Sequence, residues 1–177
     1  ISRGLVGSEM CIRDRKNRPN LLAWKKVVKR KTKPSKSINV AFVGKYVDLK
    51  DAYFSLTEAL DHAGINNDTK VNINFVNSDE LDSRNYSSKL KKSDAILVPG
   101  GFGGRGIEGM ILAAKYAREK KVPYFGICLG LQIAIIEIAR NLCGLKDANS
   151  TEFKPKTKHK VISLITESVS YTHLRAH

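Results

Sequence analysis

From Ile38 onward the chain alternates apolar runs with amphipathic segments, and this alternation constrains its fold more than any other feature. The apolar runs predict strands over residues 38–44, 70–78, 94–99, 122–127 and 159–166. The intervening segments predict helices over residues 51–64, 84–92, 106–121 and 129–142. Strands with continuous rather than alternating hydrophobicity are typical of parallel sheets that are covered on both faces. We therefore expect an α/β fold, a doubly wound and mostly parallel sheet with helices on both faces.

The net charge of +14 is unevenly distributed along the 177 residues. Residues 1–37 hold 12 Lys and Arg against 2 Asp and Glu, and residues 154–177 hold 5 against 1. Residues 38–153 hold 14 of each sign. The basic charge therefore belongs to the flanks rather than to the predicted domain, which argues against a nucleic-acid-binding fold. We interpret the basic run over residues 25–36 as a solvated linker.

The cysteines and the hydropathy exclude several other classes of protein. Three widely spaced cysteines make no disulfide framework and no zinc-binding pattern, so we expect a reducing, cytoplasmic compartment and no metal site. No apolar run approaches the roughly eighteen residues that a membrane helix needs, and the N-terminus does not read as a signal peptide. We expect neither a membrane nor a nucleic acid as a partner.

A glycine-rich loop, GFGGRG over residues 101–106, lies between the third predicted strand and the helix that follows. It matches the G-x-G-x-x-G fingerprint of dinucleotide-binding proteins. That fingerprint also requires an acidic residue about twenty positions farther on, and residues 122–126 contain none. Five glycines in residues 100–106 still indicate a close backbone approach to another group. A nucleotide-binding α/β module that uses this loop is therefore the alternative hypothesis.

Cys128 occupies the corner between the fourth predicted strand and the next helix, in the sequence Gly126-Ile127-Cys128-Leu129-Gly130. A nucleophile flanked by glycines at such a corner is the pattern of a nucleophile elbow. The glycines remove Cβ atoms that would collide in the sharp turn, and the helix N-terminus favours the reactive thiolate. The sequence thus predicts a cysteine nucleophile, with the Leu129 amide free to bind a developing oxyanion.

The segments VPGGFGGRG, PYFGICLGLQ and ANSTEF together resemble the class I glutamine amidotransferase domain of the CTP synthases. The resemblance extends from Leu21 to about Glu167, and it implies a flavodoxin-like form of the predicted fold. It also implies that the cysteine hydrolyses glutamine through a thioester and releases ammonia. The ammonia would serve a separate synthetase domain, which aminates UTP to CTP at the expense of ATP.

The resemblance implies a role for the residues of these motifs. Cys128 would be the nucleophile, and the amides of Gly101 and Leu129 would form the oxyanion hole. Glu152 would bind the α-ammonium group of the substrate. The glutamine pocket as a whole would comprise Gly101, Leu129, Gly130, Leu131, Gln132 and Glu152.

The resemblance also implies effectors and partners. Phe102 and Arg105 would form a movable pocket cover and effector region, where GTP acts as an allosteric activator. This domain would carry no cofactor or metal itself, whereas the full-length enzyme would use Mg-ATP. The partners would be glutamine, the synthetase domain and further copies in a homotetramer. We expect Lys45, which follows the first predicted strand, at the interface with the synthetase domain.

Two features depart from the family's pattern. The family's catalytic base is a histidine oriented by a glutamate two residues later, and none of the four histidines, His62, His159, His173 and His177, begins such a pair. Both ends of the chain resemble translated adapter sequence rather than the family. We therefore expect an artefact-like flank over 1–15, a basic interdomain linker over 16–37, a C-terminally truncated amidotransferase domain over 38–167 and an artefact-like tail over 168–177. Such a fragment should be inactive alone.

Overall fold

The computed structural model describes residues 19–47, 49 and 51–163. Its helices are α2 (Leu22–Thr32), α3 (Phe54–Asn66), α4 (Tyr86–Leu90), α5 (Ile107–Lys120) and α6 (Leu129–Asn141), with a short 3₁₀ turn η1 (Ser78–Glu80). Its strands are β1 (Lys36–Gly44), β2 (Thr69–Asn77), β3 (Ala95–Val98), β4 (Tyr124–Gly126), β5 (Ala148–Ser150) and β6 (His159–Ile162).

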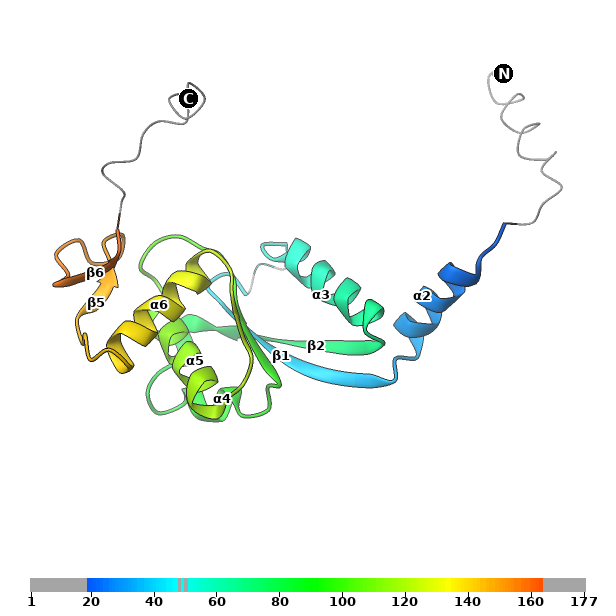
Figure 1. Cartoon of the computed structure of the whole chain (residues 1–177), viewed down its shortest axis with the longest axis horizontal. Helices are drawn as coiled ribbons and strands as arrows, with labels where there is room; N and C mark the ends of the chain where they lie inside the picture. Colours follow the sequence, from blue (N-terminus) through cyan, green and yellow to red (C-terminus); the bar gives the residue numbers. More distant parts are fainter. Residues whose placement is uncertain (1–18, 48, 50, 164–177) are drawn as a thin grey trace, which may run out of the picture.

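The main sheet has four parallel strands in the order β2-β1-β3-β4. Helix α3 covers one face of this sheet, and α4, α5 and α6 gather on the other (Figure 1). The predicted doubly wound α/β fold is therefore confirmed. Because the strand order reverses between β1 and β3, the carboxyl ends of these two strands flank the crevice where sheets of this kind usually bind ligands.

Strand β1 has a buried side chain on each face because it is central in the sheet. Val40 and Phe42 pack under α3, whereas Ala41 and Val43 point to the opposite face. This alternation follows from the two-residue period of a strand.

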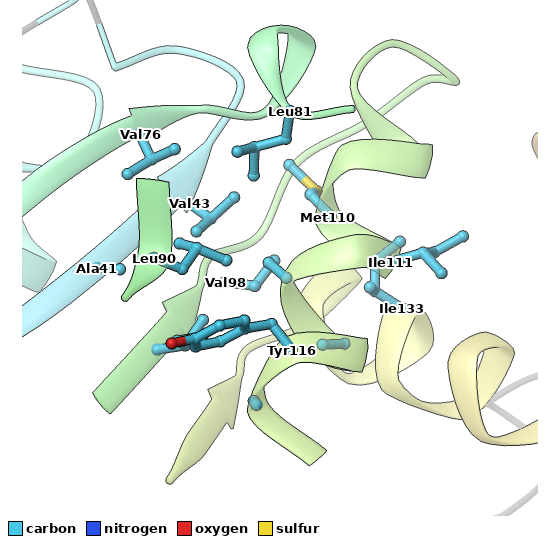
Figure 2. Close-up of a cluster of buried hydrophobic side chains, with 14 of the residues drawn as sticks. Ala41, Val43, Val76, Leu81, Leu90, Val98, Met110, Ile111, Tyr116 and Ile133 are labelled. Carbon is cyan, nitrogen blue, oxygen red and sulfur yellow. The ribbon is translucent and has the colours of Figure 1, made fainter. Parts of the chain in front are cut away.

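The larger of the two cores lies between the sheet and helices α4, α5 and α6. Figure 2 shows Val43 and Val98 of the sheet meeting Met110 of α5 and, behind it, Ile133 of α6. Ile133 is fully buried, and Met110 is 1% exposed. This core fixes α5 and α6 against β3, and these two helices follow the glycine loop and Cys128 respectively.

Strand β6 differs from the prediction in its place and length. A fifth strand was expected over 159–166, and β6 does begin at His159, but it pairs in parallel with β5 in a separate two-stranded sheet. Strand β5 was not predicted, because three residues in a polar segment carry no recognisable period. Of the expected strand, residues 164–166 lie outside the described residues.

The basic run that we interpreted as a linker is helical through Thr32, and β1 already begins at Lys36. Helix α2 buries none of its residues, so this segment is solvated as expected. It attaches to α3 through an ion pair of 2.8 Å between Lys31 and Asp61 and a hydrogen bond from Arg30 to the carbonyl of Asn66. The expected domain limits at 15, 37 and 167 remain predictions.

Candidate active site

Cys128 sits on the predicted corner, between the end of β4 and the first residue of α6. Its backbone angles are φ 53° and ψ −105°, and its side chain is exposed. A non-glycine residue with positive φ is strained, and such strain concentrates at functional sites. The geometry is that of a nucleophile elbow, which presents its side chain at the carboxyl edge of the sheet.

The flanking glycines are required by contacts within the protein. A Cβ atom on Gly126 would lie 2.5 Å from the carbonyl of Gly130. A Cβ atom on Gly130 would lie 2.1 Å from the carbonyl oxygen of Val98 at the end of β3. Both positions must therefore lack a side chain if α6 is to start this close to the sheet.

The start of the glycine loop lies directly beside the elbow. A Cβ atom on Gly100 would be 3.5 Å from Cβ of Cys128, and one on Gly101 would be 3.3 Å from Cδ2 of Leu129. Within the described part of the chain, the amides of Gly101 and Leu129 donate no hydrogen bond. The two amides that we expect to form the oxyanion hole are therefore unpaired among the described residues, and their role remains a prediction.

A hollow of about 360 Å³ lies beside the first turn of α6. Gln132 contributes a buried side-chain oxygen that has no partner among the described residues, and Glu152 contributes a carboxylate. The complete lining is Gln132, Ser150, Thr151, Glu152, Ile162 and Ser163. An unpartnered amide oxygen beside a carboxylate suits a ligand that carries an ammonium group.

Not every predicted pocket residue lines this hollow. Leu131 is 57% exposed and is not among the lining residues, whereas Leu129 is buried beneath the glycine loop. Gly130 serves the packing of the elbow. The structure thus brings together Gln132 and Glu152 as pocket residues.

Glu152 is connected to the glycine loop, because its carboxylate accepts a 3.0 Å hydrogen bond from the amide of Gly103. Asp147 joins the two ends of the segment that carries Glu152. Its carboxylate accepts hydrogen bonds from the side chains of Lys154 and Thr157 and from the amide of Lys158. The bond from Lys154, followed by the one from the Lys158 amide, lowers the pKa of Asp147 to about 2.

Lys45 is buried under the glycine loop, with only 2% of its surface exposed. Its ammonium group donates to the carbonyl of Phe102 at 2.9 Å and to the carbonyl of Gly103. Burial lowers the pKa of Lys45, which the carboxylate of Glu152 partly opposes. Our expectation that Lys45 lies at the interface with the synthetase domain is therefore wrong. The chain leaves the buried central strand β1 directly beneath the glycine loop, and the loop covers the Lys45 side chain.

Phe102 and Arg105 lie on the outer side of the same loop. The Phe102 side chain is 82% exposed. Arg105 donates to the carbonyl of Lys45, pairs with Asp79 at 3.2 Å and lies 5.5 Å above the ring of Tyr46. An exposed aromatic ring near a guanidinium group is compatible with the predicted cover and effector region, which remains a prediction.

Helix α6 is anchored to its surroundings at both ends. At its start, the Tyr124 hydroxyl donates a 2.8 Å bond to the carbonyl of Gly130, and burial raises the pKa of Tyr124. Farther along, the buried carboxylate of Glu137 accepts three bonds of 2.8–3.0 Å from Arg118 of α5. These contacts fix the helix whose first residue follows the nucleophile.

No catalytic base is evident among the described residues. His62 lies in the groove between α2 and α3, and His159 opens β6; neither bonds to Cys128 within residues 19–47, 49 and 51–163. His173 and His177 lie outside the described residues. The described part also contains no cluster of three His, Cys, Asp or Glu side chains that could hold a metal ion, and none of its helices is long and apolar enough to cross a membrane.

A family model and several known proteins match this chain. The model of the family "Glutamine amidotransferase class-I" matches residues 48–174. The CTP synthase of Syntrophus aciditrophicus is 53% identical over 158 residues, which cover 89% of this chain and 29% of that protein. The CTP synthase of Methanocaldococcus jannaschii is 52% identical over 169 residues, or 92% of this chain and 31% of that protein.

A solved structure, described as the Trypanosoma brucei CTPS glutaminase domain with bound acivicin, superposes with a TM-score of 0.69. It is 40% identical in sequence, and the match covers 76% of this chain and 53% of that one. The chain thus spans roughly three tenths of the length of the curated relatives it matches. The family model matches most of this chain, and the elbow, the glycine loop and the hollow are all present. The chain therefore belongs to the class I glutamine amidotransferases.

Proposed function

We propose that this chain is the glutaminase part of a CTP synthase. Its relatives at 50–55% identity are CTP synthases, and the structural relative binds acivicin at a CTPS glutaminase domain. The observation that carries the proposal is the strained Cys128, which lies against Gly100 at the carboxyl edge of the sheet.

The proposed reaction begins with attack of the Cys128 sulfur on the side-chain amide carbon of glutamine. Negative charge then develops on the amide oxygen, where the free N–H groups of Gly101 and Leu129 would stabilise it. Expulsion of ammonia leaves a thioester, and water hydrolyses the thioester to glutamate and the free thiol. Removing one such oxyanion donor typically costs a factor of about 10²–10³ in rate.

The hollow beside α6 would bind the amino-acid end of the substrate. The Glu152 carboxylate would pair with the α-ammonium group, and the unpartnered oxygen of Gln132 would accept a second hydrogen bond from it. Gln132 lies in the first turn of α6, directly after Cys128, and Glu152 is hydrogen-bonded to Gly103 of the glycine loop. This arrangement selects for a free amino acid rather than for a simple amide.

The proposal extends to the whole enzyme. The released ammonia would reach a synthetase domain that uses Mg-ATP to aminate UTP, in a cytoplasmic homotetramer. GTP would act as an activator at the outer side of the glycine loop, where Phe102 and Arg105 expose an aromatic ring and a guanidinium group. An aromatic ring can stack on a purine base, and a guanidinium group can bind phosphates.

The alternative, a nucleotide-binding module based on the glycine loop, has less support. The protein's own atoms account for two glycines of the fingerprint: a Cβ on Gly106 would lie 2.2 Å from Oγ of Ser78, and one on Gly101 would lie 3.3 Å from Cδ2 of Leu129. The space beneath the loop is filled by Lys45. Pyrophosphate would have to displace these groups.

The experiment that tests the proposal uses the full-length enzyme with Glu152→Ala. Loss of a charge-assisted hydrogen bond is worth about 1.5–3 kcal/mol, so the KM for glutamine should rise about ten- to a hundredfold. CTP formation from added ammonia should be unchanged, because ammonia bypasses the pocket. Glu58→Ala, which removes a half-buried carboxylate of α3 that does not line the hollow, is the matched control. An equal loss of both activities in the Glu152 variant would mean a structural role and would contradict the proposal.

A further inference from the structure

The crevice between the carboxyl ends of β1 and β3 is occupied by a side chain of this protein. Lys45 is the first residue after β1, and its stem runs beneath the glycine loop that follows β3. The Cδ and Cε atoms of Lys45 lie 3.8 and 3.9 Å from the position of a Cβ atom on Gly101. In a doubly wound sheet this is the crevice expected to receive a ligand. Here it holds a lysine that contacts the loop instead.

The ammonium group of Lys45 determines how the loop's peptide groups are turned. It donates hydrogen bonds to the carbonyl oxygens of Phe102 and Gly103. The Phe102 carbonyl and the Gly103 N–H belong to one planar trans peptide, so they point in opposite directions. With the carbonyl held by Lys45, the N–H is directed at Glu152, which accepts it at 3.0 Å.

Burying an ammonium group costs free energy, because the charge loses its hydration. Met would fill the same volume without the cost of removing a charge from water. The charge is therefore explained by what it does, which is to hold two carbonyl oxygens that no described backbone amide binds. The Lys45 carbonyl in turn accepts a 2.9 Å bond from Arg105, which ties the far end of the loop to the same residue.

We propose that Lys45 is a positioning residue of the glutamine site. Its ammonium group fixes the Phe102–Gly103 peptide, and through it the carboxylate of Glu152 and the Gly101 backbone beside Leu129. This inference rests on the proposed glutaminase function, but its structural part concerns only contacts within the chain. Lys45 itself is not expected to touch the substrate.

The test compares Lys45→Met with a matched control, Lys92→Met, which removes an exposed lysine from the turn before β3. Two quantities are measured on the 177-residue chain. The first is amide hydrogen exchange in residues 100–106. The second is the rate of Cys128 alkylation by a chloroketone analogue of glutamine and by iodoacetamide, which does not need the pocket.

In Lys45→Met we expect exchange in the loop to accelerate at least tenfold and the glutamine analogue to react at least tenfold more slowly. Iodoacetamide should react within twofold of the wild-type rate, and the control should behave as wild type. Unchanged loop exchange and unchanged analogue selectivity would overturn the proposal. A wild-type chain that the analogue does not label at Cys128 would count against the glutaminase function, while loop exchange would still decide the role of Lys45.

A measurement on the wild-type chain covers the case in which Lys45→Met fails to fold. An ammonium group held by two carbonyls in a buried site exchanges its protons slowly, so its ¹⁵N–¹H signal should be observable by NMR near neutral pH. Observation of that signal, with a contact to the Gly101 protons, would support the proposal. A Lys45 ammonium that exchanges as rapidly as that of Lys92 would overturn it.

Discussion

Replacing Glu137 with Gln tests whether the contact between α5 and α6 stabilises the fold that carries the nucleophile. Glu137 is 2% exposed, and its carboxylate accepts bonds from Nε and Nη2 of Arg118 at 2.8–3.0 Å. Asn141 donates a further bond of 3.0 Å to the same carboxylate. Glutamine keeps the volume of the side chain but replaces one acceptor oxygen with an amide group that faces the guanidinium.

The magnitude follows from the burial of the two partners. Breaking a buried ion pair by removing one charge costs about 3–5 kcal/mol. The Arg118 side chain is 31% exposed, so solvent can partly compensate its charge, and glutamine retains one acceptor. We therefore expect a loss of about 2 kcal/mol in the free energy of unfolding. For a chain of this size, that corresponds to a fall in Tm of about 4–8 °C.

The assay is urea unfolding followed by circular dichroism, with Glu119→Gln as the matched control. Glu119 also faces Arg118, but at 3.8 Å and with its side chain 40% exposed. Exposed pairs contribute about 0–1 kcal/mol, so the control should differ little from wild type. If Glu137→Gln and Glu119→Gln unfolded at the same urea concentration, the reasoning from burial would be refuted.

Three further predictions concern the site. A chloroketone analogue of glutamine should alkylate Cys128 faster than Cys143, although both thiols are exposed, and peptide mapping that found Cys143 modified first would contradict the elbow assignment. Gly130→Ala should lose about 1–3 kcal/mol in urea unfolding, because its Cβ would overlap the Val98 carbonyl; wild-type stability would refute this. Asp147→Asn should destabilise the chain at neutral pH, and the gap from wild type should narrow as pH falls from about 4 toward 2, because the carboxylate's contribution is lost through its folded pKa; a gap independent of pH would contradict this.

The main sheet could be predicted because its strands and helices carry strong local periods. The predicted limits of its strands, and of the helices between them, lie within a few residues of the observed ones. Strand β5 was missed because Ala148–Ser150 is short and polar, and a strand of that kind is stabilised by its partner rather than by its own propensity. For the same reason, the pairing of β6 with β5 was not foreseen.

The elbow was predictable because its requirements are local. Two glycines that flank a cysteine at a strand-to-helix corner indicate that side chains would collide there. The structure confirms this, because Cβ atoms on Gly126 and Gly130 would overlap backbone atoms. Lys45 was not predictable in this way, since its role depends on a loop 57 residues farther along the chain. The only local signal was its position at the end of a buried central strand, where ligand sites are expected.

The glycine loop illustrates why a motif needs its structural context. The same letters, G-x-G-x-x-G, serve here to accommodate Ser78 and to let the backbone pass close to Leu129. The peptide groups of the loop are directed by a buried ammonium below and a carboxylate to one side. A phosphate-binding loop would instead point successive amides at one anion. Because Lys45 binds two of the loop's carbonyls, the loop is better suited to placing single amides at an oxyanion and at Glu152 than to enclosing a phosphate.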